Sequence, residues 1–338
     1  MNHQAPRLTI IMPVYNAAKY IDEAVESILS QTFEDFQFWI IDDGSTDDTR
    51  QVIDGINDIR VSKICHDKNR GRVAVVNEVI RKIQTEYFTI TDADDASHPS
   101  RLEKQIALMD KDKELAMCGT SYSAIDEQGY VIRHMNLKAD YPSIFRAILN
   151  QSQFHGPTTV MRKNVIEVFP EFYRLYFKEN MADSDLTSRI VDRFKAVNLP
   201  ERLYYYRILK TSLSRKSYSI RFASLDQLIA MLSKQRRADG EDDLMKNSPE
   251  KVDQYLNVIS KKYLDDPSLI YQQAATYHLY WKMDKAAWTN IVKAFALKPL
   301  HFRNFLLLGY ILVMIVRNSI LKMSRPHYRT YFKTPYLH

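Results

Sequence analysis

The segment Thr89–Asp95 constrains the fold and chemistry of this chain more than any other. Thr89, Ile90 and Thr91 are typical of the end of a buried strand, and Asp92, Asp94 and Asp95 follow directly. Carboxylates this close repel one another unless a positive charge lies among them. Divalent cations such as Mg²⁺ and Mn²⁺ take oxygen ligands of this kind. The segment therefore predicts a strand that ends in a metal site.

A second acidic turn, Asp42-Asp43-Gly44-Ser45, follows the apolar run 36–41. Taken alone, it is equally well explained as an Asp-Gly turn with a helix cap. In open α/β sheets, however, ligands bind beyond the carboxyl ends of the strands. Two acidic strand ends in one sheet thus predict one site for a metal and a polar ligand.

Apolar runs and helical periodicity alternate through the first third of the chain. Strands are expected at 8–12, 36–41, 61–65 and 87–91, and helices at 18–31, 48–56, 72–83 and 100–109. This alternation predicts an α/β domain with a doubly wound parallel sheet. Neither a G-x-G-x-x-G turn nor a P-loop occurs, so any nucleotide phosphates would be neutralised by metal rather than by a glycine loop.

The pattern changes after residue 115. A hairpin is expected from 115–123 and 130–134, and the following strands and helices complete a mixed half that ends near Arg215. Beyond it only helical periodicity remains, at 219–237, 249–264 and 267–297. We therefore expect three parts: an α/β domain at 1–215, an α-helical domain at 216–300 and a basic, apolar segment at 301–338.

The C-terminal segment combines apolar and basic character. Residues 305–316 are an uninterrupted apolar run that would span roughly 18 Å as a helix, short of the roughly 30 Å bilayer core. From Lys282 onward there are ten Lys and Arg and one acid, so the tail carries +9 in a chain of net charge +6. Two interpretations stay open: a helix in the interface of an anionic membrane, or a buried helix of the helical domain.

Four ordered motifs resemble the family 2 glycosyltransferases of GT-A fold. They are Ile11–Asn16 (IMPVYN), Ser27–Phe33 (SILSQTF), Ile41–Asp47 (IDDGSTD) and Asp92–Asp95 (DADD). The resemblance covers about residues 7–210. It implies a GT-A fold with a mixed sheet and an inverting transfer of sugar from a nucleotide-diphosphate donor, expected to be a UDP-sugar, assisted by Mn²⁺ or Mg²⁺. The acceptor it implies is a hydroxyl of a glycan or lipid-linked glycan in bacterial surface polysaccharide biosynthesis.

The resemblance also implies roles for individual residues. Pro13, Tyr15 and Asp43 would hold the base of the nucleotide, with Asp42 behind them. Asp92 would meet the ribose and, with Asp94, the metal. Val76 stands where the family has an Arg before Asn77, so Arg72 is the candidate that supplies charge to the diphosphate.

On the acceptor side, the family's Glu-Asp pair corresponds to Ala182-Asp183. Asp183 is therefore the expected general base, and Asp185 is the alternative because the Glu is absent. His155, in the stretch His155-Gly156-Pro157, is expected on the acceptor side. The missing Glu also leaves open a non-catalytic protein that binds sugar nucleotides.

Composition bears on location and partners. The two cysteines, Cys65 and Cys118, fit no metal pattern and are expected to be reduced, which suits the cytoplasm. The C-terminal segment is the candidate for peripheral attachment at the inner face of the cell membrane. Nucleic acid is not an expected partner, because the basic tail lacks the interleaved aromatic platform that single-strand binding uses.

Overall fold

The computed structural model describes residues 5–178, 180–209, 218–322 and 325–332. These residues form two compact units. The first comprises residues up to 124, residues 133–207 and the end of the chain from 331, and the second comprises residues 125–132 and 208–330. The expected domain boundary at 215/216 lies outside the described residues, and the three-part division stays a prediction.

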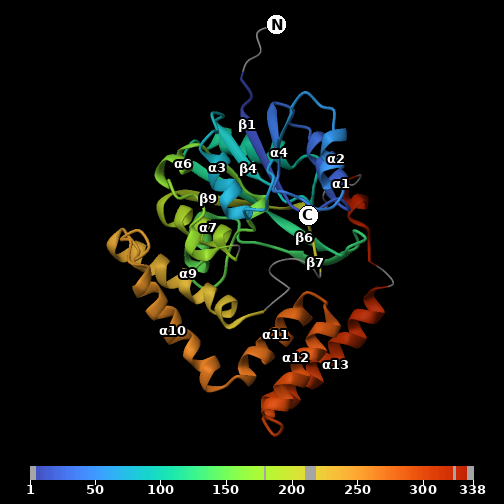
Figure 1. The fold of residues 1–338 in the computed structure, drawn as a ribbon, viewed down its shortest axis with the longest axis vertical. Coiled ribbons are helices and arrows are strands. Elements are labelled where there is room, and N and C mark those ends of the chain that lie inside the picture. The colour runs from blue at the N-terminus through green and yellow to red at the C-terminus, as the bar shows by residue number, and fades with distance from the viewer. Residues whose placement is uncertain (1–4, 179, 210–217, 323–324, 333–338) are drawn as a thin grey trace. The chain divides into compact units, whose positions relative to one another are not determined.

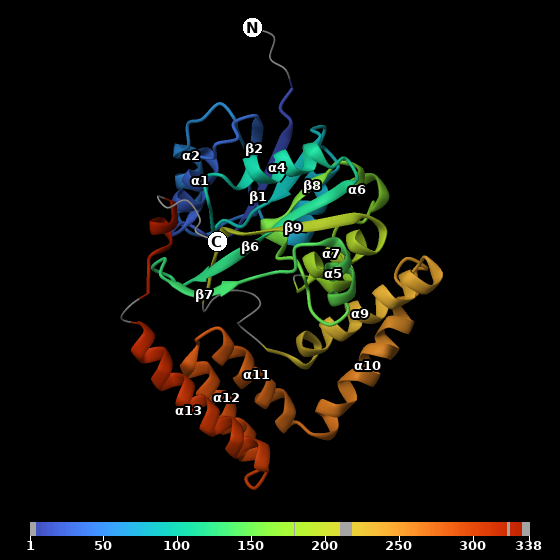
Figure 2. The ribbon, with the colours of Figure 1, turned by 180° about the vertical axis from the view of Figure 1, so that it is seen from behind.

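Across the described ranges, a nine-stranded sheet has the order β3-β2-β1-β4-β8-β6-β9-β5, with β7 paired to β6. Its parallel half consists of β3 (Val61–Cys65), β2 (Phe36–Asp42), β1 (Leu8–Val14) and β4 (Tyr87–Ile90). The other strands are β5 (Ala96–Ser97), β6 (Leu115–Ile125), β7 (Val131–Met135), β8 (Val160–Arg162) and β9 (Lys195–Arg207). Strand β8 runs antiparallel to both β4 and β6, and β6 and β9 are neighbours (Figure 2).

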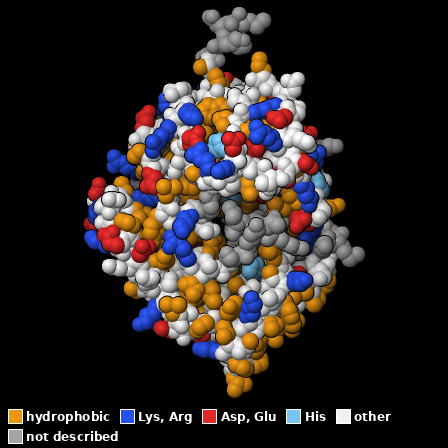
Figure 3. Space-filling model, viewed as in Figure 1, with side chains coloured by type: hydrophobic (Ala, Val, Ile, Leu, Met, Phe, Trp, Pro, Cys, Tyr) orange, Lys and Arg blue, Asp and Glu red, His pale blue; other side chains and the backbone are white. Residues whose placement is uncertain are grey.

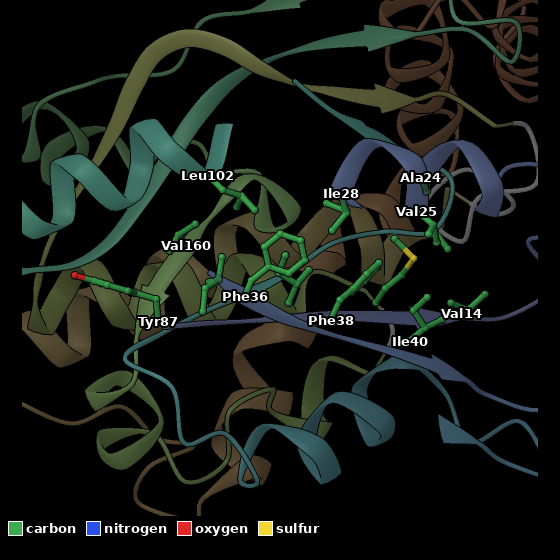
Figure 4. Close-up of a cluster of buried hydrophobic side chains, with 14 of the residues drawn as sticks. Val14, Ala24, Val25, Ile28, Phe36, Phe38, Ile40, Tyr87, Leu102 and Val160 are labelled. Carbon is green, nitrogen blue, oxygen red and sulfur yellow. The ribbon is translucent and has the colours of Figure 1, made fainter. Parts of the chain in front are cut away.

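Helices cover the parallel half because its strands are apolar on both faces. They are α1 (Ile21–Leu29), α2 (Thr49–Gly55), α3 (Arg72–Ile80) and α4 (Arg101–Lys111). Figure 4 shows Val25 and Ile28 of α1 and Leu102 of α4 turned toward Phe36 and Phe38 of β2. Burial of such side chains contributes about 1.5–3 kcal/mol each and fixes the helices on the sheet.

The second half of this unit contains short helices between its strands. They are α5 (Tyr141–Ala147), η1 (Gly156–Thr158), α6 (Asn164–Val168), η2 (Leu175–Phe177) and α7 (Ala182–Arg193). The antiparallel strands make the sheet mixed, and the alternation of strands and helices confirms the expected α/β architecture.

The second unit contains the helices α9 (Ile220–Asp239), α10 (Pro249–Asp265), α11 (Ser268–Tyr280), α12 (Asp284–Leu297) and α13 (Phe302–Lys322) (Figure 1). The short helix η3 (Tyr328–Phe332) begins in this unit and ends in the first. A small core joins α11, α12 and α13 through Ala275, Ile291 and Ile311. The expected helical C-terminal part is therefore confirmed.

Helix α13 is longer than the apolar run alone indicated. It has 21 residues and so reaches about 31 Å, and Phe302–Ile320 could cross a bilayer by length and composition alone. Only 17% of that window is buried, so α13 is not the buried helix of the second interpretation. Asn304, Ile311 and Asn318, spaced seven apart, form its buried stripe. In Figure 3, hydrophobic side chains gather over the part of the view where Figure 1 places α11 to α13.

Candidate active site

The carboxyl ends of β2, β1 and β4 lie side by side. Val14 is in register with Asp42, the Asp43 N–H donates to the Val14 carbonyl at 2.8 Å, and the Thr91 N–H donates to the Ile11 carbonyl at 2.9 Å. Both acidic turns predicted from the sequence therefore lie at one edge of the sheet. This follows from parallel pairing, which aligns the ends of neighbouring strands.

Of the four residues expected to hold the base, Asp42 and Asp43 are buried and Tyr15 is 48% exposed. Oδ1 of Asp42 accepts the Ser45 N–H at 3.0 Å, and Gly44 adopts φ +71°, so the Asp42 side chain closes this turn. Pro13 is half-buried in β1, opposite Ile41. An exposed aromatic ring can stack on a flat ligand, and carboxylate oxygens can accept hydrogen bonds from the N–H groups of that ligand.

Asp43 also holds the loop that starts α3. Its carboxylate accepts the backbone N–H of Arg70 at 3.0 Å and of Gly71 at 2.8 Å. Gly71 has φ +87°, and α3 begins at the next residue, Arg72. Asp43 thereby fixes where the Arg72 side chain leaves the helix.

The turn Asp92–Asp95 is held by β9. The Arg207 N–H donates to Oδ1 of Asp95 at 2.7 Å, and its Nε donates to the Asp94 carbonyl at 2.8 Å. Its guanidinium also pairs with Glu23 of α1 at 2.6 Å. Asp92 and Asp94 remain half-buried beside these contacts of Arg207.

The three acids fit a hard divalent cation by their donor type. Burial raises the pKa of Asp95 well above its ordinary value, and the charges of Asp94 and Asp92 raise that pKa further. Oδ2 of Asp95 is buried without a hydrogen-bond partner in the part of the chain that the structure describes. No cluster of three His, Cys, Asp or Glu able to hold a metal occurs among the described residues. A Mg²⁺-type ion needs only one or two carboxylates when substrate phosphates supply its other ligands.

Arg72 lies beside Asp92. One of its terminal nitrogens donates to Oδ1 of Asp92 at 2.9 Å, and the side chain is 29% exposed. Burial would lower the pKa of Arg72, but its surroundings, among them the charges of Asp92 and Asp183, raise that pKa above its ordinary value. Arg72 is therefore cationic throughout the working pH range and lies within electrostatic reach of Asp183.

Asp183, in the first turn of α7, faces the stretch that contains His155. A methyl group on Gly156 would come within 2.8 Å of Oδ2 and 2.9 Å of Cβ of Asp183. The His155 ring lies 4.6 Å from the Tyr122 ring and 4.5 Å from that of Tyr206. The structure thus brings Asp183 against Gly156, the residue that follows His155, and packs aromatic rings against His155.

Asp185, the alternative base, lies in a different environment. It is fully buried, and its two oxygens pair with Arg174 at 3.4 Å and Arg189 at 2.8 Å. A carboxylate held by two arginines is a structural ion pair, and removing one partner would leave buried charge behind. This geometry favours Asp183 over Asp185 as a group that can accept a proton from a ligand.

Three residues of this site did not emerge from the sequence: Arg207, Tyr204 and Tyr173. The hydroxyl of Tyr204 lies 3.3 Å from Oγ1 of Thr91, and Tyr173 lies under the Arg72 guanidinium, 5.7 Å from ring centroid to Cζ. In the sequence, the run Tyr204–Arg207 has the composition of a half-buried strand and nothing more. An arginine at the end of an aromatic strand was the only available signal, and it identifies no partner.

Comparisons with known proteins agree with this geometry. Residues 9–180 match the family described as Glycosyl transferase family 2. A Bacillus subtilis protein named as a glycosyltransferase, EpsE, is 29% identical over 70% of this chain and 84% of its own length. An uncharacterized glycosyltransferase of Haemophilus influenzae is 33% identical over 48% of this chain and 65% of its own length.

Two solved structures share the fold, each at 17% identity. The structure of S. aureus TarS 1–349 in complex with UDP-GlcNAc has a TM-score of 0.58 and covers 92% of this chain and 89% of that one. The mannosyltransferase PcManGT from Pyrobaculum calidifontis, in complex with GDP-Man and Mn²⁺, has a TM-score of 0.53 and covers 95% and 88%. With the acidic strand ends and the mixed sheet, these matches show that the chain belongs to glycosyl transferase family 2 and has its GT-A fold.

Proposed function

We propose that this glycosyltransferase moves a sugar from a nucleotide-diphosphate donor, with inversion and with a divalent metal, to a hydroxyl of a glycan or lipid-linked glycan. The observation that carries the proposal is the place of Arg72, which pairs with Asp92 and is also influenced by the charge of Asp183. Asp92 follows strand β4 of the parallel half, and Asp183 lies in the first turn of helix α7 of the mixed half. A donor at the first and an acceptor at the second would meet at Arg72.

On the donor side, Pro13, Tyr15 and Asp43 would contact the base, with Asp42 holding the turn behind them. The exposed ring of Tyr15 and the buried acids support this assignment. The donor expected is a UDP-sugar, and the UDP-GlcNAc complex of TarS, which has the same fold, supports that choice.

Asp94 and Asp92 would hold Mn²⁺ or Mg²⁺. When bound, such an ion stabilises the negative charge that develops on the departing diphosphate. Arg72, permanently cationic, would act on the same charge from the α3 side. The Mn²⁺ in the complex of PcManGT supports the metal assignment.

Asp183 would accept the proton of the attacking hydroxyl. A general base must lie within hydrogen-bond reach of that proton. Gly156 carries no side chain, and this leaves room for the Asp183 carboxylate, because a methyl group on Gly156 would come within 2.8 Å of its Oδ2. His155, which precedes Gly156, would also contact the acceptor. The acceptor class and a role in bacterial surface polysaccharide assembly rest on the family resemblance alone.

The alternative is a non-catalytic protein that binds sugar nucleotides, and turnover separates the two. Thermal shift with UDP-GlcNAc, UDP-glucose, UDP-galactose and GDP-mannose, each with Mn²⁺, identifies the donor. A ligand at 100 times its Kd adds about 2.7 kcal/mol to the stability of the folded state. Release of nucleoside diphosphate from the stabilising donor is then measured. Binding without release, also with added glycan acceptors, supports the alternative and contradicts our proposal.

We also propose that α13 attaches the enzyme to anionic membrane in the plane of the interface. Exposed apolar side chains cover its free side: Phe302, Phe305, Leu306, Tyr310, Leu312, Val313, Val316 and Ile320. Arg303 and Arg317 lie near its ends, as anionic lipid would favour.

The packing of α13 supports docking in the plane rather than crossing. Asn304 bonds to the Ala294 and Lys298 carbonyls, and Asn318 bonds to Asp284, so the helix is fixed to both ends of α12. If α13 crossed a bilayer, α12 and its lysines would have to enter with it, at a cost of several kcal/mol. A cytoplasmic enzyme at the inner face of the membrane follows from this proposal.

A further inference from the structure

Tyr173 lies where the two halves of the site meet. Its side chain is 2% exposed, and its neighbour Phe172 packs on Phe88 of β4 with ring centroids 5.7 Å apart. Since Asp92 follows β4, the segment that carries Tyr173 is anchored to the strand that leads into the acidic turn.

The backbone of Tyr173 is clamped by α3. Nδ2 of Asn77 donates to the Tyr173 carbonyl at 2.7 Å, and the Tyr173 N–H donates to Oδ1 of Asn77 at 2.8 Å. The backbone N–H and carbonyl of Tyr173 are thus both satisfied by the Asn77 side chain, which lies 96 positions away in sequence. Asn77 belongs to the same helix that begins with Arg72.

Helix α7 holds the adjoining residues. Arg189, which pairs with Asp185, donates to the Phe172 carbonyl at 2.6 Å and to the Glu171 carbonyl at 3.3 Å. Asp183 lies in the first turn of this same helix. The segment 171–173 therefore joins the helix of Arg72 to the helix of Asp183.

Tyr173 also contacts Arg72 directly. The guanidinium lies over its ring, with Cζ 5.7 Å from the centroid. Burial raises the pKa of Tyr173 to about 12, while nearby Arg72 lowers it and the charges of Asp183 and Asp92 raise it. The hydroxyl therefore stays protonated at working pH, in a position where Arg72, Asp92 and Asp183 all influence it.

We infer that Tyr173 is a positioning residue that holds the Arg72 guanidinium between Asp92 and Asp183, and that Asn77 and Arg189 fix Tyr173 in that place. This inference rests on the proposed function, in which Arg72 meets the charge of the departing diphosphate. A flexible arginine that is already placed stabilises that charge without reorganisation at the moment of reaction.

The backbone next to Asp183 supports a precise placement. Met181 has φ +59° and Lys178 has φ +52°, a left-handed region that side chains disfavour. Such strain persists only where the surroundings enforce it, and it concentrates at functional sites.

The test substitutes Tyr173→Phe, which keeps the ring under Arg72 and removes only the hydroxyl. Tyr87→Phe is the matched control, because it also deletes a buried hydroxyl, one that donates to Asp110 at 2.9 Å at the amino end of β4. The readout is release of nucleoside diphosphate from the donor that stabilises the wild type, with water as acceptor. We expect Tyr173→Phe to lower kcat by about 10- to 100-fold with donor KM changed less than about threefold, and Tyr87→Phe to change neither.

A second arm shows whether Tyr173 acts through Arg72. In an Arg72→Lys background, Tyr173→Phe should cost less than about threefold, because residues that act as a unit are not additive. Equal kcat in Tyr173→Phe and Tyr87→Phe would overturn the inference, and so would full additivity of Tyr173→Phe with Arg72→Lys. In either case, turnover by the wild type would still uphold the proposed function. If the wild type binds donor but never releases nucleotide, both fall together.

Discussion

The backbone N–H of Arg207 donates a 2.7 Å hydrogen bond to Oδ1 of Asp95, across 112 positions of sequence. Strand β5, just after the acidic turn, pairs with β9 at Tyr204 and Tyr205. Strand β9 therefore holds both the last residue of the turn and the two residues that follow it. The carboxylates of Asp92 and Asp94 are therefore presented by a rigid frame. This arrangement allows one acid to be removed without loss of the fold.

We predict that Asp94→Ala abolishes sugar transfer and metal-dependent donor binding while the protein stays folded. Removing one acid relieves repulsion within the turn, so the free energy of unfolding should hold or rise slightly in the absence of metal. Isothermal titration of donor with and without Mn²⁺, and urea unfolding, measure the two effects. Full activity of this variant, or of the wild type in excess chelator, contradicts the metal assignment.

We predict that Asp183→Asn keeps donor affinity and loses turnover, because a base acts on the acceptor proton and not on the nucleotide. The loss should appear in kcat by at least about 100-fold. Asp185→Asn is the matched comparison. The neutral amide leaves the buried charges of Arg174 and Arg189 uncompensated, and this should destabilise the fold by about 3–5 kcal/mol. A stable Asp185→Asn without turnover, beside an active Asp183→Asn, would move the base to Asp185.

We predict that Gly156→Ala lowers kcat although the backbone of Gly156 tolerates alanine. The new methyl group would lie 2.9 Å from Cβ of Asp183, too close for either group to stay in place. A shift of about 1 Å in a reacting group costs up to about 100-fold in rate. Gly55→Ala, which meets nothing within 4 Å, is the control. Unchanged kcat in Gly156→Ala would show that Asp183 need not occupy its present place.

The strands, the helices and the two acidic turns were predictable because they depend on local patterns. Apolar runs identify buried parallel strands, and parallel pairing then brings Asp42 and Asp92 to one edge. The clamps were not predictable. Arg207 and Asp95, or Asn77 and Tyr173, are polar residues far apart in sequence, and nothing in their neighbours identifies the partner.

The length of α13 escaped the sequence analysis for a related reason. The apolar run was counted between Arg303 and Arg317, but a helix continues through arginines whose long stems lie along its apolar surface. The buried Asn304 and Asn318 were equally unexpected in such a run. Each is satisfied by partners on α11 or α12, which the run itself does not reveal.

We predict that His98 makes the protein less stable as pH falls below about 6.5. Burial lowers the pKa of His98 below its ordinary value, so the unfolded chain binds a proton that the folded state resists. Stability is therefore fully present above the unfolded pKa of about 6.5 and is lost as pH falls toward the lower folded pKa. His98→Asn, whose amide oxygen can replace the Nδ1 that accepts the Ser100 N–H, should lose less stability between pH 7 and pH 5 in urea unfolding. Equal losses in both proteins would contradict this prediction.

The last prediction concerns α13, on which Leu306, Val313 and Ile320 are spaced seven apart and are 58%, 65% and 67% exposed. We expect the triple substitution of these residues by Glu to leave the melting temperature nearly unchanged, because Ile311 carries the packing on the opposite side. Flotation with phosphatidylglycerol vesicles should fall by at least about 10-fold, since apolar burial is lost and negative charge faces anionic lipid.

The control for this substitution is the pair Val258→Glu and Leu264→Glu, exposed apolar residues of α10 in the same unit, which should not alter flotation. Wild-type binding should weaken with salt without vanishing, because charge supplies one part of the attraction and apolar burial the other. It should be much poorer on phosphatidylcholine. If the wild type is a dimer that the triple substitution converts to monomer, while neither form floats, the exposed face of α13 binds a second copy of the chain rather than lipid.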